Sequence, residues 1–296
     1  MNPWPFANAS TAAQAPPICW DFGGGRGLEL GGGAVLMGIV NVTPDSFSDG
    51  GRFLDRDRAV AHGLELVAQG AAIVDVGGQS TRPGSQEVPL EEELSRVIPV
   101  VEGLRAAGDA AISVDTYRAP VAAAALDAGA DIVNDISAFR FDDGMLPLVA
   151  ERGAHAVAMH IRGTPRDMQA NPCYGDVVAE VCAYLAGALE RAEAAGVPRG
   201  RVAVDPGIGF GKTAEHNLEL LRALSRFREL GSPVLVGASR KSFIGKVLGA
   251  EVDERLEGTL AVSALAAAAG ADIVRVHDVG PNLRAVRMAE AVVGRG

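Results

Sequence analysis

From residue 35 onward, short apolar runs alternate with longer amphipathic stretches. Each run is rich in Val, Ile and Ala, and each stops at polar or small residues. The eight runs are VLMGIVN (35–41), AIVDVGG (72–78), AISVDT (111–116), IVNDI (132–136), HAVAMH (155–160), VAVDPG (202–207), PVLVGAS (233–239) and IVRVHD (273–278). Unbroken apolar runs are typical of strands that are covered on both faces, so we predict a parallel sheet.

Glycine-alanine pairs join several amphipathic stretches to the next apolar run. They occur at Gly70-Ala71, Gly129-Ala130, Gly153-Ala154 and Gly270-Ala271, and the pentapeptide GADIV appears twice, at 129–133 and 270–274. Glycine just past a helix end supplies the left-handed cap that lets the chain turn. The pairs therefore predict a repeated joint in which a helix ends and a strand follows at once.

The amphipathic stretches carry apolar stripes at helical spacing. The predicted stripes are Leu64 and Val67 before Gly70; Leu94, Val97, Ile98 and Val101 in the next stretch; and Leu218, Leu221, Leu224 and Phe227, with Leu220 widening the face, in one helix over 216–230. Eight strands alternating with eight helices predict a TIM (β/α)8 barrel as a single domain. A doubly wound open sheet is the alternative, which the strand number and the absence of GxGxxG after the first run disfavour.

The first 30 residues lack this periodicity and are rich in Pro, Ala, Asn and Gly. We predict a flexible N-terminal tail over 1–30 and the barrel over 31–296. Within the first segment, Cys19–Phe22 and Leu28–Leu30 are candidates for a short hairpin that closes the bottom of the barrel.

Composition and charge restrict the partners and the compartment. The chain of 296 residues is 48% hydrophobic and carries a formal net charge of −10, which argues against a general nucleic-acid binder. Its three cysteines have an odd count and no metal-type spacing, which suits a reducing compartment. With no membrane-span pattern and no secretory signal pattern, we expect a cytoplasmic protein without a membrane or nucleic-acid partner.

Polar side chains collect where the apolar runs end. They are Asn41; Asp75 and Gln79; Asp115; Asn134 and Asp135; His160; Asp205; Ser239, Arg240 and Lys241; Arg275 and His277. In a barrel the active site lies at the carboxyl ends of the strands, so these groups are expected to meet at one rim. Burying so many polar groups is unfavourable unless they bind a ligand or one another.

The residue types indicate the ligand. Asp115, Asn134, Asp205 and Lys241 offer acceptors and donors that suit a flat, nitrogen-rich heterocycle, on which Arg275 can lie. Structural alternatives exist: Asp115 and Asp135 are also suited to capping the helices that follow them. His155 precedes its strand and is expected to be a surface or core residue.

An anion site is expected beside the heterocycle. Asn41, Arg275 and His277 can receive phosphate oxygens, with Mg²⁺ sharing the charge.

Three glycine- or serine-rich loops follow predicted strands. In VAVDPGIGFGK (202–212) a carboxylate, Asp205, ends the strand and a glycine-rich loop follows. The loops NVTPDSFSDGGRF (41–53) and GGQSTRPGSQEVP (77–89) are long, with Pro44 and Pro83 as pivots. Long loops at the active face of a barrel act as lids or substrate clamps.

These stretches together resemble the dihydropteroate synthase family of pterin-binding enzymes. The matching motifs are MGIVNVTPDSFSDGG (37–51), VDVGGQSTRPG (74–84), SVDTYR (113–118), NDIS (134–137), MHIRGTP (159–165), DPGIGFGK (205–212), GASRKSFIG (237–245) and VRVHDV (274–279). The resemblance implies condensation of 6-hydroxymethyl-7,8-dihydropterin diphosphate with p-aminobenzoate by an S_N1-like displacement. It also implies a homodimer through helices near the C-terminal part of the barrel. The apolar, alanine-rich stretch Leu260–Ala269 is compatible with such an interface and equally with a place in the core.

The resemblance also assigns roles by motif position. Asp115, Asn134, Asp205 and Lys241 would hold the pterin, with Arg275 stacked on it. Asn41 would bind Mg²⁺ and diphosphate, and Arg275 and His277 would contact the diphosphate. The p-aminobenzoate side would be formed by Thr81, Arg82, Pro83, Phe210, Lys241 and Ser242. Asp115, Lys241, Arg275 and His277 would act in catalysis.

Two positions depart from the family pattern. Gln79 stands where the loop motif usually reads GGESTRPG, so a salt bridge that orients the loop is expected to be missing. Arg162 adds a cation in MHIRGTP, where MHMQGTP is usual, either at the pterin mouth or only at the rim. Two alternatives remain open: a pterin-binding methyltransferase that serves a corrinoid, and a paralogue that binds without turnover.

Overall fold

The computed structural model describes residues 17–42 and 52–295. Its central sheet has eight strands: β3 (Val35–Asn41), β4 (Ile73–Gly77), β5 (Ala111–Asp115), β6 (Ile132–Asp135), β7 (His155–Met159), β8 (Val202–Asp205), β9 (Leu235–Val236) and β10 (Ile273–Val276). They pair in the order β8-β7-β6-β5-β4-β3-β10-β9, and all these pairs are parallel. Each of the eight predicted runs contains one of these strands.

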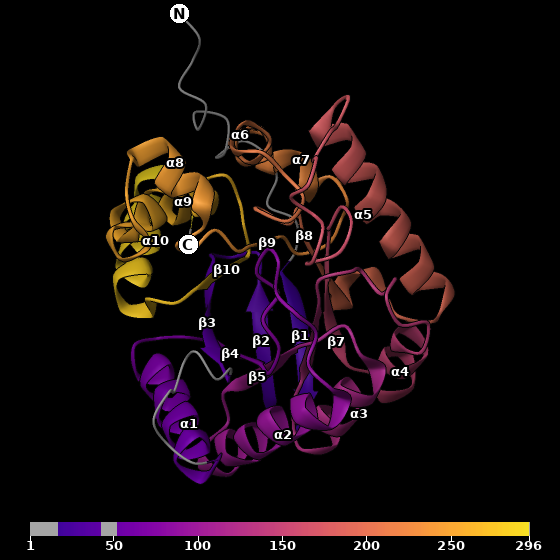
Figure 1. Cartoon of the computed structure of the whole chain (residues 1–296). Coiled ribbons are helices and arrows are strands. Elements are labelled where there is room, and N and C mark those ends of the chain that lie inside the picture. The colour runs from indigo at the N-terminus through magenta and orange to yellow at the C-terminus, as the bar shows by residue number, and fades with distance from the viewer. Residues whose placement is uncertain (1–16, 43–51, 296) are drawn as a thin grey trace, which may run out of the picture.

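The sheet closes into a barrel between β8 and β9. Val204 forms a parallel bridge with Val234, and its backbone N–H donates to the carbonyl of Pro233 at 2.8 Å. Figure 1 shows the strands at the centre with the helices around them. The predicted TIM (β/α)8 barrel is therefore confirmed, and the open-sheet alternative is wrong.

Helices follow every strand of the barrel. They are α1 (Arg52–Ala68), α2 (Leu90–Ala107), α3 (Ala119–Asp127), α4 (Met145–Arg152), α5 (Val177–Ala194), α6 (Ala214–Arg222), α7 (Leu224–Arg228), α8 (Ser242–Leu248), α9 (Leu256–Ala268) and α10 (Val279–Val293). Among the described residues, none of these helices is both long and apolar enough to cross a bilayer.

The predicted helix-to-strand joints are confirmed by backbone geometry. Gly70, Gly129, Gly153 and Gly270 have φ values of 103°, 108°, 61° and 96°, in the left-handed region that glycine reaches without strain. A side chain at Gly70 or Gly270 would also meet Leu283 Cδ2 at 2.5 Å or Arg228 Cδ at 2.7 Å. At Gly129 a Cβ would likewise lie 2.8 Å from Arg105 Cγ. Each joint therefore needs glycine for its turn, and at three of them a Cβ would also crowd a neighbouring side chain.

Two predictions about helices are wrong in detail. The single helix expected over 216–230 is divided into α6 and α7, because the backbone of Ala223 leaves helical geometry with φ −103° and ψ 17°. In α1 the stripe residue Leu64 is 38% exposed, and Leu66 is buried in its place. Three-residue spacing alone selected Leu64, which lies two positions before Leu66 and faces outward.

An antiparallel hairpin covers the N-terminal end of the barrel. It is formed by β1 (Ile18–Gly23) and β2 (Arg26–Leu30), so the predicted hairpin is present. Trp20 and Leu30 are buried against one apolar side chain from each strand: Met37, Ile73, Ala111, Ile132, Val157, Ala203, Leu235 and Ile273. The hairpin thus seals the bottom, and the boundary of the tail at residue 30 stays a prediction, since residues 1–16 lie outside the described range.

His155, at the start of β7, belongs to this end as a core residue. Its ring lies 4.8 Å from Trp20 and 5.2 Å from Phe22, and it is 3% exposed. Burial lowers its pKa to about 4, so the imidazole is neutral at pH 7.

Candidate active site

Three charged side chains from different strands meet at the carboxyl end of the barrel. Arg275 donates from Nε to Asp75 Oδ2 at 2.6 Å and from Nη2 to Asp115 Oδ2 at 2.7 Å. Asn134 Nδ2 also donates to Asp75 Oδ2, at 3.1 Å. Strands β4, β5, β6 and β10 therefore deliver four polar groups to one point inside the barrel.

Two carboxylate oxygens in this cluster lack a partner. Asp75 Oδ1 and Asp115 Oδ1 are buried and make no hydrogen bond to any described residue. Burial raises the pKa of Asp115 to about 7, opposed by Arg275 and reinforced by Asp75. Buried acceptors of this kind are costly unless a ligand satisfies them, which marks this point as a binding pocket.

Asp205 and Lys241 lie on the other side of Arg275. A Cβ on Gly237 would lie 3.7 Å from Arg275 Cβ and 3.9 Å from Asp205 Oδ2, so both side chains border the same glycine. Burial raises the pKa of Asp205, while Lys241, Lys212 and Arg275 oppose the shift. Burial lowers the pKa of Lys241 to about 8, and Asp205 opposes this most.

The glycine-rich loop after β8 is held by side chains along its length. Four successive carbonyls accept hydrogen bonds: Ile208 from Lys241, Gly209 from Gln169, Phe210 from Lys212, and Gly211 from Tyr174. Asp205 Oδ1 accepts from the N–H of Gly207 at 2.7 Å. A loop with its backbone groups satisfied in this way keeps one shape.

The same loop presses against the end of β7. Gly207 has φ 69°, and a Cβ there would lie 1.9 Å from the carbonyl oxygen of His160. At Gly211, φ 65°, a Cβ would lie 2.6 Å from the carbonyl oxygen of Arg162. Both positions exclude other residues, so the glycines of DPGIGFGK are required by close approach as well as by conformation.

Phe210 borders an apolar lining beside the charged groups. Its ring centroid lies 4.7 Å from Lys241 Nζ, a cation–π contact. Together with Tyr117 it packs on a small buried cluster: Ile136, Met159, Ile161 and Met168. The mouth therefore has one polar and one apolar side.

His277 is fixed in orientation at the end of β10. Its Nδ1 lies 2.9 Å from Ser239 Oγ, which also accepts the His277 backbone N–H at 3.2 Å. Burial, Arg275 and Arg240 lower the pKa of His277 to about 4, so the ring is neutral at pH 7. With the Ser239 O–H donating to Nδ1, the ring proton stands on Nε2, where it can serve a ligand.

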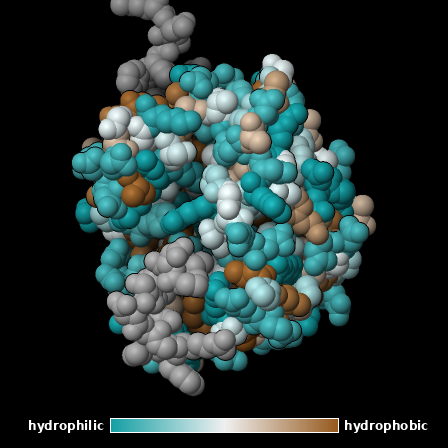
Figure 2. All heavy atoms as spheres, in the orientation of Figure 1, coloured by the Kyte–Doolittle hydropathy of each residue, from teal (hydrophilic) through white to brown (hydrophobic). Residues whose placement is uncertain are grey.

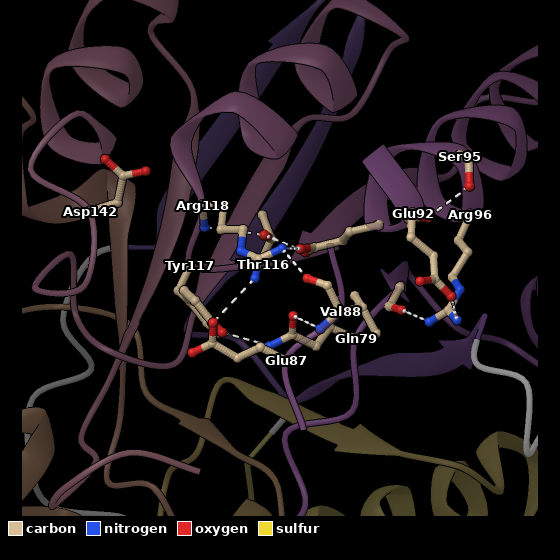
Figure 3. Close-up of polar contacts among 12 residues, drawn as sticks. Gln79, Glu87, Val88, Glu92, Ser95, Arg96, Thr116, Tyr117, Arg118 and Asp142 are labelled. Carbon is tan, nitrogen blue, oxygen red and sulfur yellow. Dashed lines mark hydrogen bonds and ion pairs between the residues drawn. The ribbon is translucent and has the colours of Figure 1, made fainter. Parts of the chain in front are cut away.

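The loop between β4 and α2 is anchored to the residues that follow Asp115 (Figure 3). Gln79 Nε2 donates to Tyr117 Oη at 2.6 Å, and Gln79 Oε1 accepts from the N–H of Val88 at 3.4 Å. Arg118 Nη1 donates to the carbonyl of Val88 at 2.8 Å. The Gln79 amide thus orients the loop through Tyr117 and Val88 without the charge of a carboxylate.

A buried carboxylate completes this anchor. Glu93, 2% exposed, accepts from Thr116 Oγ1 at 2.7 Å and from Arg118 Nη1 at 3.0 Å. Burial raises the pKa of Glu93, with Thr116 and Arg118 opposing. Thr116 to Arg118 therefore tie β5 to both ends of the second loop.

Within that loop, Thr81 is half-buried and Arg82 and Pro83 are exposed. The N–H of Gly84 donates to the carbonyl of Pro165 at 3.0 Å, which joins the loop to the segment after β7. Ser242, at the start of α8, is exposed. The structure thus places these residues at the rim; of the first loop (41–53), residues 43–51, with Thr43, Pro44, Asp45 and Ser46, lie outside the described residues.

Arg162 points away from the pocket. Its guanidinium lies 4.3 Å from the ring centroid of Tyr174, and Nη1 lies 3.3 Å from Glu180 of α5. The added cation is neutralised at the rim, which decides between the two expectations for this position.

Two strand-end residues have structural contacts. Asp135 accepts from the N–H and Oγ of Ser137, both at 2.7 Å, and from the N–H of Phe139, so it shapes the turn after β6. It does not cap the following helix, α4, whose N-cap is Gly144, so the capping alternative is wrong for this residue. Arg240 pairs with Asp278. Neither joins the Arg275 cluster.

Asn41 ends β3, half-buried, opposite Gly77 of β4. Among the described residues no group of three His, Cys, Asp or Glu side chains is arranged to hold a metal ion. One amide oxygen fits a magnesium ion whose remaining ligands are substrate phosphates and water, the usual situation for this ion.

Residue patterns did not identify two parts of the site. The residue pattern marks Asp75 as polar but does not predict its contact with Arg275. The signal in the sequence is a carboxylate inside an otherwise apolar run. Lys212 and His160, whose side chains lie 2.8 Å apart between Nζ and Nδ1, were likewise not assigned a role.

Comparison with known proteins agrees with this geometry. The family model described as "Pterin binding enzyme" matches residues 37–277. A dihydropteroate synthase of Mycobacterium leprae is 51% identical over 269 residues, covering 88% of this chain and 94% of the relative. The structure of Xanthomonas albilineans dihydropteroate synthase with 4-aminobenzoic acid has a TM-score of 0.87 and 47% identity, covering 93% of this chain and 98% of that one. Another structure of that enzyme, in complex with 7,8-dihydropteroate, has a TM-score of 0.83, 44% identity and the same coverage.

Proposed function

The chain belongs to the pterin-binding enzyme family as one of its dihydropteroate synthases, and from that premise we propose that it condenses 6-hydroxymethyl-7,8-dihydropterin diphosphate with p-aminobenzoate. The products are 7,8-dihydropteroate and diphosphate. The observation that carries the proposal is the pair of buried oxygens beside Arg275, Asp75 Oδ1 and Asp115 Oδ1, which have no hydrogen-bond partner among residues 17–42 and 52–295. A pterin presents the ring N–H groups that such acceptors need.

The pterin lies in the barrel mouth among Asp115, Asn134, Asp205 and Lys241. Asp205 faces the amino edge of the ring, where a carboxylate accepts two N–H bonds. Arg275 changes partners on binding, because its present bridge between Asp75 and Asp115 occupies the ring pocket. Freed from part of that bridge, its planar guanidinium stacks on the ring and reaches the diphosphate.

The reaction proceeds by an S_N1-like displacement. The exocyclic C–O bond breaks, the electron pair leaves with the diphosphate, and a pterin methylene cation remains. Arg275 and the Nε2–H of His277 stabilise the departing anion, and Asp115 stabilises the cation. The amine of p-aminobenzoate then forms the C–N bond and releases its proton to water or diphosphate.

Mg²⁺ fits this site through Asn41 and the diphosphate oxygens, and when bound it would neutralise charge on the leaving group. The chain's own residues orient the partners. Phe210, Lys241 and Ser242 meet p-aminobenzoate on one side, and Thr81, Arg82 and Pro83 meet it on the other. Holding amine and cation together supplies the proximity contribution to the rate.

Diphosphate release tests the proposal directly. Purified protein with Mg²⁺ and the pterin diphosphate should release diphosphate only when p-aminobenzoate is added, and 7,8-dihydropteroate should appear in equal amount. Arg275→Lys should lose most of the activity, because an ammonium lacks the planar guanidinium fork that bridges Asp75 and Asp115 and that stacks on the ring. A matched control is Arg226→Lys, on the exposed side of α7. Binding of the pterin without turnover in the wild-type protein would favour the non-catalytic paralogue, and methyl transfer would favour the methyltransferase.

A homodimer is the proposed assembly, through the C-terminal helices. Six of the exposed large apolar side chains lie in α8, α9, α10 and the turn after α8: Val247, Leu248, Val252, Leu265, Met288 and Val292. In Figure 2 the left side, where these helices lie, shows brown groups among the teal. Leu265→Lys with Met288→Lys should convert a dimer into monomers by light scattering; an unchanged mass would place the interface elsewhere.

The cytoplasmic location also stays a prediction. It is supported by the three cysteines, Cys19, Cys173 and Cys182, all of which are free.

A further inference from the structure

Lys212 is a buried lysine that makes no hydrogen bond to a carboxylate of the described residues, and burial lowers its pKa well below the usual range. It is 3% exposed, and its Nζ lies 2.8 Å from His160 Nδ1 and 3.0 Å from the carbonyl oxygen of Phe210. A lysine is seldom buried to this degree unless it is paired. The contacts therefore need an explanation beyond packing.

His160 is arranged as the acceptor. It directly follows β7 and is 5% exposed, and its ring lies 4.6 Å from the ring of Tyr184, edge to face. Burial and Lys212 lower its pKa to about 2, so the ring is neutral and Nδ1 can accept from the Lys212 amino group. Lys212 thus links the end of β7 to the loop after β8.

The linked loop carries Phe210. Lys212 holds the carbonyl of Phe210 from inside the protein, and Lys241 holds the carbonyl of Ile208 while its Nζ lies over the Phe210 ring. The two lysines therefore fix the same short segment from two directions. Lys241 faces the proposed pterin pocket, whereas the hydrogen bonds of Lys212 go to His160 and to the carbonyl of Phe210.

We propose that Lys212 is a positioning residue, which with His160 sets the place of the Phe210 ring and thereby the affinity for the aromatic amine substrate. The inference rests on the proposed function, because it assigns that substrate to the Phe210 side. Two of the proposed pterin residues, Asp115 and Asn134, lie on β5 and β6, away from the link, whereas Phe210 lies within the linked loop. The affinity for the aromatic amine should therefore respond to a change in the link more than the affinity for the pterin does.

Three variants separate positioning from folding. Lys212→Met removes the amino group at similar length. His160→Leu removes the acceptor and leaves the amino group in place. His160→Asn restores an acceptor, since Oδ1 of Asn occupies the place of Nδ1 of His. Lys246→Met, at an exposed position on α8, is the matched lysine control.

Steady-state diphosphate release gives KM for p-aminobenzoate, and calorimetry gives Kd for the pterin diphosphate. We expect Lys212→Met and His160→Leu to raise KM for p-aminobenzoate by roughly tenfold, the effect of about one hydrogen bond. Kd for the pterin diphosphate should change less than about threefold in His160→Leu. His160→Asn should recover most of the loss, and Lys246→Met should match the wild type.

A double-variant cycle with Phe210→Ala decides whether Lys212 acts through that ring. The double variant should be no worse than Phe210→Ala alone, because the link has nothing left to position. Additive effects, or equal losses for both substrates together with a lowered melting temperature, would overturn the inference. If Lys212→Met does not fold, the His160→Leu and His160→Asn pair gives the same decision. Wild-type protein that releases no diphosphate would instead refute the proposed function.

Discussion

The two ends of the barrel are built from the same eight strands, but they are stabilised in opposite ways. At the N-terminal end each strand contributes one apolar side chain to a cluster that Trp20 and Leu30 complete. At the carboxyl end the strands contribute Asp75, Asp115 and Arg275, with two carboxylate oxygens unpartnered among the described residues. The first end stabilises the fold by burying apolar surface. The second end keeps buried polar groups whose hydrogen bonds a ligand can complete.

Both ends contain buried carboxylates, and they differ in whether the carboxylate oxygens have hydrogen-bond partners. Asp131 near the bottom is 8% exposed, and its oxygens accept from Arg26 at 2.8 Å, Arg105 at 2.7 Å and the N–H of Ile112 at 3.0 Å. Asp115 at the mouth has one oxygen bonded to Arg275, and its other oxygen has no partner in the described part of the chain. A buried carboxylate is thus structural where its bonds are complete, and available to a ligand where they are not.

The largest expected effect is at the bottom. Trp20→Ala removes the plug of the apolar cluster and the hydrogen bond from Nε1 to the carbonyl of Gly200, 2.7 Å long. We expect a loss of about 3–5 kcal/mol in the free energy of unfolding, by urea titration. Substrate affinity of the folded fraction should be unchanged; a large change in Kd would mean that the two ends are not independent.

The next effect compares two buried carboxylates. Asp205→Asn should weaken binding of the pterin diphosphate by roughly 10- to 100-fold in calorimetry, because a charged acceptor is lost. Its stability should not fall, since burial raises the pKa of Asp205 and disfavours the charged form. Asp131→Asn is the matched control: it should lose on the order of 2 kcal/mol of stability and keep its affinity. The reverse pattern would contradict the division of roles.

A smaller effect follows from the pKa of Asp115, about 7 in the folded protein against the ordinary 3.8. Between pH 4 and 7 the folded state keeps a proton that the unfolded state has lost, so this group's contribution to stability decreases as pH rises through that range. Asp115→Asn removes the contribution. Its stability relative to the wild type should therefore increase from pH 4 to pH 7, by urea titration at each pH. A constant difference would show that Asp115 is ionised throughout.

The smallest effect concerns the second loop. Gln79→Glu restores the family's usual residue, and a carboxylate can accept from both the O–H of Tyr117 and the N–H of Val88. Since both contacts exist already, KM for p-aminobenzoate should change by less than about fivefold. Gln79→Leu, which removes both contacts, is the comparison and should raise KM more. If the Glu variant differed more than the Leu variant, charge rather than loop anchoring would control this position.

Local patterns determined much of the molecule. The apolar runs predicted the place of each of the eight strands, because a strand that is covered on both faces is apolar along its whole length. Glycine before a strand predicted the four left-handed joints, since other residues are strained there. The motifs identified the family, and the polar strand ends indicated the rim on which the site is built.

Tertiary structure alone decided which polar residues act together. Arg275 meets Asp75 across 200 positions of sequence, and Lys212 meets His160 across 52. Asp135 and Asp115 are equally acidic strand ends, yet one closes a turn and the other faces the pocket. The inward or outward direction of each side chain depends on how neighbouring strands are staggered in the closed sheet, and residue type does not encode that stagger locally.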